Sequence, residues 1–314
     1  MMHDPLQAAT PALAVQGLSY RFGRTTVLDG LELEIPQGAL YALLGANGAG
    51  KTTLLQLLIG ARPLQQGAVR LFGTERSRLS PAQRQQITYV AEGQELPAWM
   101  RLSQLEAFCA PLYPTWDHAL ALTLRARFEL DPQQMVGAMS RGQRMKAALL
   151  CALAPKPRLL IMDEPLTGMD AAVKDDLVRG LLDAASLEGA TVLLCSHDIA
   201  EIEPLADWVG ILDGGRMRVS MPIDELRARY KRIEMVTEAT MQMPEPFPAN
   251  WVSVERAGLR LSVLMEQTGV VRELPAPFRG AARIDVRDAS LKELYIALAG
   301  SSRTHAHSTT EVGA

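Results

Sequence analysis

Short apolar runs alternate with longer stretches of helical periodicity along most of the chain. Several of these runs are apolar at every position, as is typical of strands buried on both faces of a sheet; the strand candidates are residues 39–44, 87–91, 158–162, 191–195 and 208–212. Between Pro97 and Pro155 the strand pattern stops and helical periodicity dominates. The pattern predicts an α/β fold in which helices cover a sheet, with a helical subdomain inserted at about residues 97–155.

A change of pattern near residue 231 divides the chain into two parts. A turn at Asp213-Gly214-Gly215 precedes one more short strand and a helix near residues 224–230, which we expect to end the first part. Beyond it the pattern predicts a proline-rich connector, two strands and a closing helix, at residues 243–248, 251–254, 259–264 and 289–299. The expected domains are a flexible N-terminus (1–12), an α/β domain (13–230), a small α+β accessory domain (231–300) and a disordered tail (301–314).

A glycine-rich loop directly follows the first apolar run. It fits the phosphate-binding pattern G-x-x-x-x-G-K-[ST] and consists of Gly45, Ala46, Asn47, Gly48, Ala49, Gly50, Lys51, Thr52 and Thr53. Glycines let successive backbone N–H groups point at a phosphate chain, and the helix predicted from about Lys51 adds its positive dipole end. In this pattern Lys51 reaches the β- and γ-phosphates, and the Thr52 hydroxyl is a ligand of Mg²⁺. A strand before the loop and a helix after it distinguish this segment from an ordinary glycine-rich turn.

Charged and polar residues follow other predicted strands at the same sheet edge. Asp163 and Glu164 come after the apolar run at 159–162, where Asp163 is suited to hold Mg²⁺ and Glu164 to polarise a water molecule for attack on the γ-phosphate. His197 follows the run at 191–195 and is therefore expected beside Glu164. Ser140 and Gly142 precede a helical run and would present a hydroxyl and N–H groups to an anion, a weak indication when taken alone.

The composition is that of an ordinary globular protein, with 48% hydrophobic and 21% charged residues and a net charge of −3. This balance offers no general attraction to nucleic acid, so no nucleic-acid partner is expected. We find neither the pattern of a secretory signal nor an apolar run approaching the ~20 residues that a spanning helix requires. Any membrane part must then come from another chain. Cys109, Cys151 and Cys195 have no metal-ligand spacing and are interpreted as reduced core residues.

In their order and spacing these motifs resemble the nucleotide-binding subunit of an ABC transporter over about residues 13–230. The resemblance implies a P-loop ATPase cassette with a mixed sheet, an antiparallel β part and ATP and Mg²⁺ as cofactors. It assigns residues 45–53 to Walker A, 159–164 to Walker B and Thr167-Gly168-Met169-Asp170 to the D-loop. It further assigns Ser140-Arg141-Gly142-Gln143 to the family signature, His197 to the switch histidine, and Phe22, with Tyr20 as the alternative, to the aromatic residue that stacks on adenine.

Two positions depart from the family pattern. Arg141 stands where the signature usually has glycine, so it either contacts the γ-phosphate or, as we expect, points to solvent. Glu92 stands where the family usually has a glutamine that senses Mg²⁺ and the membrane partner, and Gln94 follows two residues later, so either could serve. The segment 89–100 resembles that of a bacterial subgroup of export-type or resistance-type ATPases that includes the YtrB-like proteins.

The resemblance also implies partners. In the family two such subunits, identical or different, enclose two ATP molecules, and Ser140 and Gly142 of one subunit would contact the ATP of the other. The dimer would drive a separate transmembrane permease, which would hold this cytoplasmic subunit at the inner face of the cell membrane. Trp99, Met100 and residues 102–108 either meet that permease or pack internally. The alternative function is a soluble, non-transport ABC ATPase, whereas a P-loop kinase or GTPase does not explain the signature segment or His197.

Overall fold

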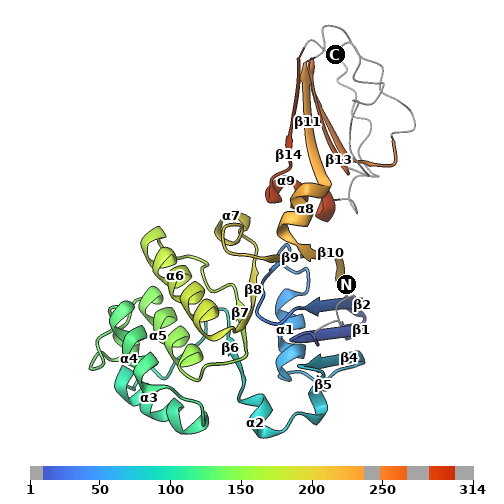
Figure 1. Ribbon diagram of the computed structural model, residues 1–314. Helices are drawn as coiled ribbons and strands as arrows, with labels where there is room; N and C mark the ends of the chain where they lie inside the picture. Colours follow the sequence, from blue (N-terminus) through green and yellow to red (C-terminus); the bar gives the residue numbers. More distant parts are fainter. Residues whose placement is uncertain (1–9, 237–247, 267–282, 301–314) are drawn as a thin grey trace, which may run out of the picture. The chain divides into compact units, whose positions relative to one another are not determined.

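The computed structural model describes residues 10–236, 248–266 and 283–300 (Figure 1). The chain forms two compact units, Met1–Ser220 and Met221–Ala314. The limit of the α/β domain predicted near residue 230 falls inside the second of these units and stays a prediction. Ala12, which we placed in the flexible N-terminus, is buried, and its N–H donates to the Ile35 carbonyl at 2.8 Å. The remaining N-terminal residues 1–9 and the tail 301–314 lie outside the described residues.

A six-stranded sheet forms the centre of the first unit. Its strand order is β10-β9-β3-β8-β7-β6, and β3, β6, β7, β8 and β9 pair in parallel. All five predicted strand candidates are strands of this sheet, to within one residue at each end. The strands are β3 (Leu40–Leu44), β6 (Ile87–Val90), β7 (Leu159–Asp163), β8 (Thr191–Ser196), β9 (Trp208–Asp213) and β10 (Arg216–Pro222). Every residue of β3, β7 and β8 is buried, which explains why their sequences lack a polar face.

A second, antiparallel sheet in the first unit has the order β2-β1-β4-β5. Its strands are β1 (Leu13–Phe22), β2 (Thr25–Ile35), β4 (Gln66–Leu71) and β5 (Thr74–Glu75). One hydrophobic core joins this sheet, the six-stranded sheet and α1 (Lys51–Ile59), whose Leu54, Leu55, Leu57 and Leu58 are fully buried. Because apolar side chains from both sheets hold α1, the loop that precedes it is fixed in place. The mixed α/β architecture agrees with the predicted fold class.

Helices make up most of the remaining first unit (Figure 1, cyan to yellow). They are α2 (Pro81–Arg84), α3 (Leu102–Cys109), α4 (His118–Arg127), α5 (Arg141–Leu153), α6 (Ala171–Glu188) and α7 (Ile199–Ile202). Residues 97–155, which are all described, contain α3, α4, α5 and two 3₁₀ turns but no β-strand beyond an isolated bridge between Arg101 and Met135. All three cysteines are free thiols, and Cys195 is fully buried.

The second unit contains a four-stranded antiparallel sheet of order β12-β13-β11-β14. Its elements are α8 (Ile223–Arg229), β11 (Tyr230–Val236), β12 (Trp251–Ala257), β13 (Arg260–Glu266), β14 (Arg283–Asp288) and α9 (Leu291–Gly300). Its own core consists of buried apolar residues, among them Ile233, Trp251 and Val263. The two strands and the closing helix expected here are present, whereas most of the expected connector at 243–248 lies outside the described residues. In the part of the chain that is described, we find no helix long and apolar enough to cross a membrane.

Candidate nucleotide site

An open groove in the first unit contains most of the residues that the sequence predicts to bind nucleotide. Its wall combines the glycine-rich loop with side chains from β1, β2 and the turns after β6, β7 and β8. The lining residues are Phe22, Val27, Ala46, Asn47, Gly48, Gly50, Lys51, Thr52, Thr53, Glu92, Glu164, Thr167 and His197. Of these, Val27 was missed, because a half-buried valine in a strand carries no sequence signal of a binding site.

The loop between β3 and α1 depends on glycine at two positions where a side chain would collide with the core. A Cβ atom on Gly45 would lie 2.8 Å from the Leu212 carbonyl oxygen. Gly50 has φ of 106°, and a Cβ atom there would lie 2.8 Å from Leu28 Cδ2. The helix begins at the next residue, Lys51, so its first N–H groups, which have no partner within the helix, face the groove.

Lys51 forms a buried ion pair at the base of the groove. Its Nζ atom donates to the Gly45 carbonyl at 2.6 Å and lies 3.2 Å from Glu164 Oε1. Only 6% of Lys51 and 7% of Glu164 is exposed, so each charge depends on the other for compensation. The ammonium group thus lies where a phosphate bound by the loop would compete with Glu164 for it.

Glu164 occupies the first position after β7 in a left-handed backbone conformation, with φ of 48°. Few residues other than glycine adopt this conformation, and it is found preferentially at functional sites. The strain aims the carboxylate into the groove, where Oε2 lies 2.8 Å from His197 Nδ1 and accepts from Thr167 Oγ1 at 3.1 Å. Because an ionised carboxylate only accepts hydrogen bonds, Nδ1 of His197 is the donor in this pair.

Asp163, the last residue of β7, is the most isolated polar group of the site. Among the described residues neither of its buried carboxylate oxygens has a well-formed hydrogen-bond partner. Burial raises the pKa of Asp163, an effect that the nearby Thr52 hydroxyl and Lys51 partly offset and that the charges of Glu164 and Glu92 reinforce. Two unpartnered hard oxygens beside a threonine hydroxyl fit a divalent cation such as Mg²⁺. No cluster of three or more His, Cys, Asp or Glu side chains suited to a metal was found in the described chain.

The structure distinguishes between the two aromatic residues that could stack on the adenine base. Phe22 lines the groove and is 45% exposed, whereas Tyr20 is buried and packs edge-on against Phe22, with 5.1 Å between the ring centroids. Only Phe22 therefore offers a ring face to a ligand in the groove. At the second ambiguous position, Glu92 lines the groove, whereas the Gln94 side chain turns back and accepts from the Ala91 N–H at 3.2 Å.

The predicted signature segment is not part of the groove. Ser140 caps α5, and its hydroxyl accepts from the Gln143 N–H while the Gln143 side chain accepts from the Ser140 N–H. Gly142 leaves no room for a Cβ atom, which would lie 2.9 Å from Val173 Cγ1. Arg141 is exposed, as expected, but its guanidinium lies against Gly168, where a Cβ atom would be 2.6 Å from Nη1.

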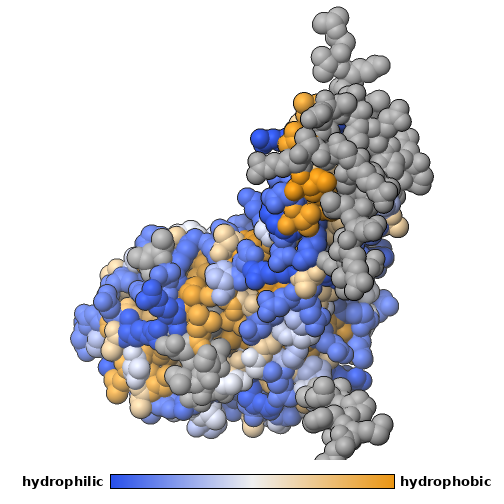
Figure 2. All heavy atoms as spheres, turned by 45° about the horizontal axis from the view of Figure 1, so that its top comes forward, coloured by the Kyte–Doolittle hydropathy of each residue, from blue (hydrophilic) through white to orange (hydrophobic). Residues whose placement is uncertain are grey.

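Residues 99–108, for which internal packing and contact with a partner were the two alternatives, include both buried and exposed apolar side chains. Met100, Leu102 and Leu105 are buried, whereas Trp99 is 72% exposed and Phe108 57% exposed. Figure 2 shows apolar surface among the polar surface of the first unit. Trp99 and Phe108 are therefore available to a partner.

Comparisons with known proteins agree on one family. The family model described as "ABC transporter" matches residues 28–167. The sulfate/thiosulfate import ATP-binding protein CysA 2 of Chromobacterium violaceum is 34% identical over 82% of this chain and 69% of its own length. YtrB of Bacillus subtilis, an ABC transporter ATP-binding protein, is 26% identical over 93% of this chain and 99% of its own length. The daunorubicin resistance ATP-binding protein DrrA3 of Streptomyces coeruleorubidus is 30% identical over 94% of this chain and 98% of its own length. A solved ATP-binding subunit of an ABC transporter superposes with a TM-score of 0.63 at 27% identity, covering 69% of this chain and 92% of its own.

Proposed function

This chain belongs to the ATP-binding subunits of ABC transporters, which hydrolyse ATP, and we propose that its groove binds ATP with Mg²⁺ as half of a dimer that drives a separate permease. The observation that carries the assignment of the site is the position of Glu164 between Lys51 and His197. It places one carboxylate in contact with both the phosphate-binding lysine and the histidine at the neighbouring strand end.

Glu164 is the general base of this proposal. A triphosphate in the loop attracts the Lys51 ammonium and releases Glu164 Oε1 to accept a hydrogen bond from the attacking water. His197 holds Oε2 through Nδ1, so the carboxylate stays aimed while the other oxygen takes the proton. Thr167 supports the same oxygen through its hydroxyl.

Asp163 and Thr52 are the residues that would hold Mg²⁺. The unpartnered oxygens of Asp163 fit this role, and Glu92 adds a third carboxylate at the rim. When bound, the cation neutralises charge on the β- and γ-phosphate oxygens. Phe22 would take the adenine ring on its exposed face.

The dimer and the permease complete the proposed assembly. Ser140, Gly142 and Gln143 lie outside the groove at the start of α5, where the helix N-terminus would face the triphosphate of a second subunit, identical or different. The exposed Trp99 and Phe108 would contact the permease, so the chain would lie in the cytoplasm at the inner face of the membrane.

Among ABC subgroups we favour the export-type or resistance-type ATPases that include YtrB. YtrB and DrrA3 match nearly their whole length, including the second unit, whereas the import-type CysA 2 is matched over 69% of its length. A soluble, non-transport role is the competing function. Affinity purification from detergent-solubilised membranes distinguishes the two, because a transport subunit recovers a multi-span membrane protein, and recovery of ribosomes or DNA alone would refute the transport role.

Replacement of Glu164 tests the proposed site. Glu164→Gln keeps the size of the side chain but removes the base, so we expect the ATPase rate to fall by roughly 10²–10⁴ while ATP binding persists. The variant should accumulate as an ATP-bound dimer in size-exclusion chromatography with Mg²⁺ and ATP. Glu34→Gln, at an exposed carboxylate of β2, is the matched control. A Glu164→Gln protein that hydrolyses ATP normally or stays monomeric would contradict the proposal.

A further inference from the structure

The ring of Phe22 has a cation on one of its faces. The guanidinium carbon of Arg62 lies over the ring, 4.9 Å from its centroid. Arg62 is not among the residues that line the groove, whereas Phe22 is. The guanidinium thus covers part of the ring outside the groove lining, while 45% of Phe22 stays exposed and available to a ligand.

Arg62 lies just after α1 and is itself held in place by a residue of that helix. Its Nε atom donates to the Gln56 side-chain oxygen, and its backbone N–H donates to the Gln56 carbonyl at 3.2 Å. Gln65 adds a clamp on the residue before the ring, since it accepts from the Arg21 N–H at 2.8 Å and donates to the Arg21 carbonyl at 3.0 Å. The same helix therefore begins at the phosphate-binding loop and ends in a segment that supports the ring.

We propose that Arg62 is a positioning residue for the purine base of the nucleotide, because it holds the Phe22 ring in the orientation that receives the base. The inference rests on the proposed function of Phe22. A half-exposed ring without support can turn about its side-chain bonds, and binding must then order it. A guanidinium over the ring is attracted to the ring electrons and removes part of that cost before the base arrives.

The expected effect is a loss of affinity for nucleotide but not for phosphate alone. An exposed cation–π contact corresponds to roughly two- to five-fold in a binding constant. Arg62→Ala should therefore weaken binding of a non-hydrolysable ATP analogue by roughly that factor. Inorganic tripolyphosphate occupies only the loop, so its affinity should not change. Arg62→Lys keeps the charge and should restore part of the loss.

A double-mutant cycle with Phe22→Ala, measured by isothermal titration calorimetry, tests the coupling. In a Phe22→Ala background, Arg62→Ala should cause no further loss, because the ring that it supports is gone. Arg70→Ala, at an exposed arginine of β4, is the control for loss of positive charge. The melting temperature of each variant without nucleotide reports any general destabilisation.

The outcomes separate this inference from the proposed function. If Phe22→Ala leaves the affinity for the ATP analogue unchanged, Phe22 is not the base platform and the assignment itself fails. If Phe22→Ala weakens binding but Arg62→Ala does not, only the role of Arg62 is refuted. An equal loss for tripolyphosphate in Arg62→Ala would also refute it, since the arginine would then act on the phosphate loop or on the fold.

Discussion

At the scale of a single residue, the buried carboxylate of Asp163 lowers the stability of the folded chain. A buried carboxylate without a good partner is costly, and the cost remains until a ligand supplies opposite charge. Glu164, next in the chain, adds a strained backbone conformation. Neighbouring residues thus contribute two different costs, both at the end of β7, and the packing of the fully buried β3, β7 and β8 offsets them.

The pH dependence of stability should report the cost at Asp163. Its pKa in the folded chain is raised, so the folded state disfavours the ionised form, and this residue's contribution to stability decreases as the pH rises from its ordinary pKa through the raised one. Asp163→Asn should therefore raise the stability of the first unit at pH 7 by about 1–3 kcal/mol. Thermal unfolding in EDTA measures this gain, which should shrink as the pH falls. A variant less stable than the wild type at pH 7 would contradict the account.

Glu92, the third carboxylate of the site, allows a separate prediction. Glu92→Gln removes a negative charge from the groove wall, so we expect the affinity for a divalent cation in the presence of an ATP analogue to fall, on the order of ten-fold or about 1.4 kcal/mol. Binding of Mn²⁺, followed by electron paramagnetic resonance, gives a readout independent of activity. Glu95→Gln removes the same charge from an exposed position of the same turn outside the groove, and it should have little effect. Equal losses in the two variants would show a general charge effect rather than a role for Glu92.

The sequence predicts the residues of the groove better than their contacts. The spacing around Lys51, Glu164 and His197 places them at one sheet edge, because parallel strands end together, and the structure brings them within hydrogen-bond or ion-pair distance. The choices between Phe22 and Tyr20, and between Glu92 and Gln94, depend on which side chain turns outward. That depends on tertiary packing, which local spacing does not encode.

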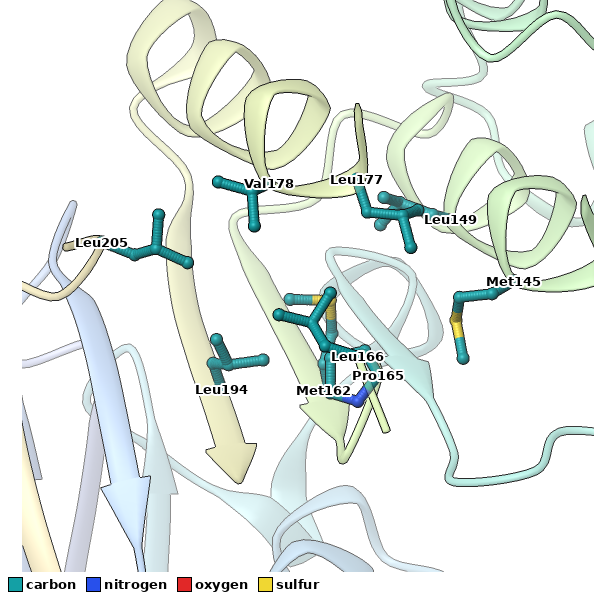
Figure 3. Close-up of a pocket in the computed structure, with 9 residues that line it drawn as sticks. All are labelled: Met145, Leu149, Met162, Pro165, Leu166, Leu177, Val178, Leu194 and Leu205. Carbon is teal, nitrogen blue, oxygen red and sulfur yellow. The ribbon is translucent and has the colours of Figure 1, made fainter. Parts of the chain in front are cut away.

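At the scale of elements, a cavity lies where α5 and α6 cover β7 and β8. It is small, and its lining consists of the apolar residues Met145, Leu149, Met162, Pro165, Leu166, Leu177, Val178, Leu194 and Leu205 (Figure 3). Pro165 and Leu166 directly follow Glu164. A gap in the packing therefore adjoins the turn that carries the proposed general base.

Filling this cavity should stabilise the first unit. Val178→Ile adds one methylene on the side chain that α6 directs at the cavity, a gain of about 0.8 kcal/mol and about 2 °C in melting temperature. Val15→Ile adds the same group to a valine that is fully packed in the core, and it should destabilise by about 1–3 kcal/mol. Differential scanning calorimetry of both variants makes the comparison. Similar effects at the two sites would mean that the cavity closes in solution.

Strands differ in how well the sequence predicts them, for a physical reason. β3, β7 and β8 are buried on both faces and so are apolar throughout, which makes them easy to find. β1 and β2 have exposed positions, and their pairing shifts register between Val15 and Leu18 and again near Tyr20, so no simple alternation runs along them. For the antiparallel sheet only the family resemblance gave an expectation.

At the scale of the whole molecule, each unit has a hydrophobic core of its own. The core that holds α1 draws its residues from positions 13–217, and the core of the second unit draws its residues from positions 233–284. Every residue that lines the nucleotide groove lies between Phe22 and His197. Binding of ATP should therefore depend on the first unit alone.

Removal of the second unit tests this independence. A chain that ends after Pro222 keeps the whole of β10, so the six-stranded sheet stays complete. We expect it to fold and to bind an ATP analogue within about two-fold of the full chain, because no contact with the ligand is lost. Its calorimetric trace should show one unfolding transition, whereas the full chain with two cores should show two.

A second comparison, of dimer formation by Glu164→Gln in the full and the shortened chain, tests whether the second unit takes part in dimerisation. If the short chain binds nucleotide but no longer dimerises, the second unit supports the dimer. If the ATPase rate and dimerisation are both unchanged, the second unit contributes to neither.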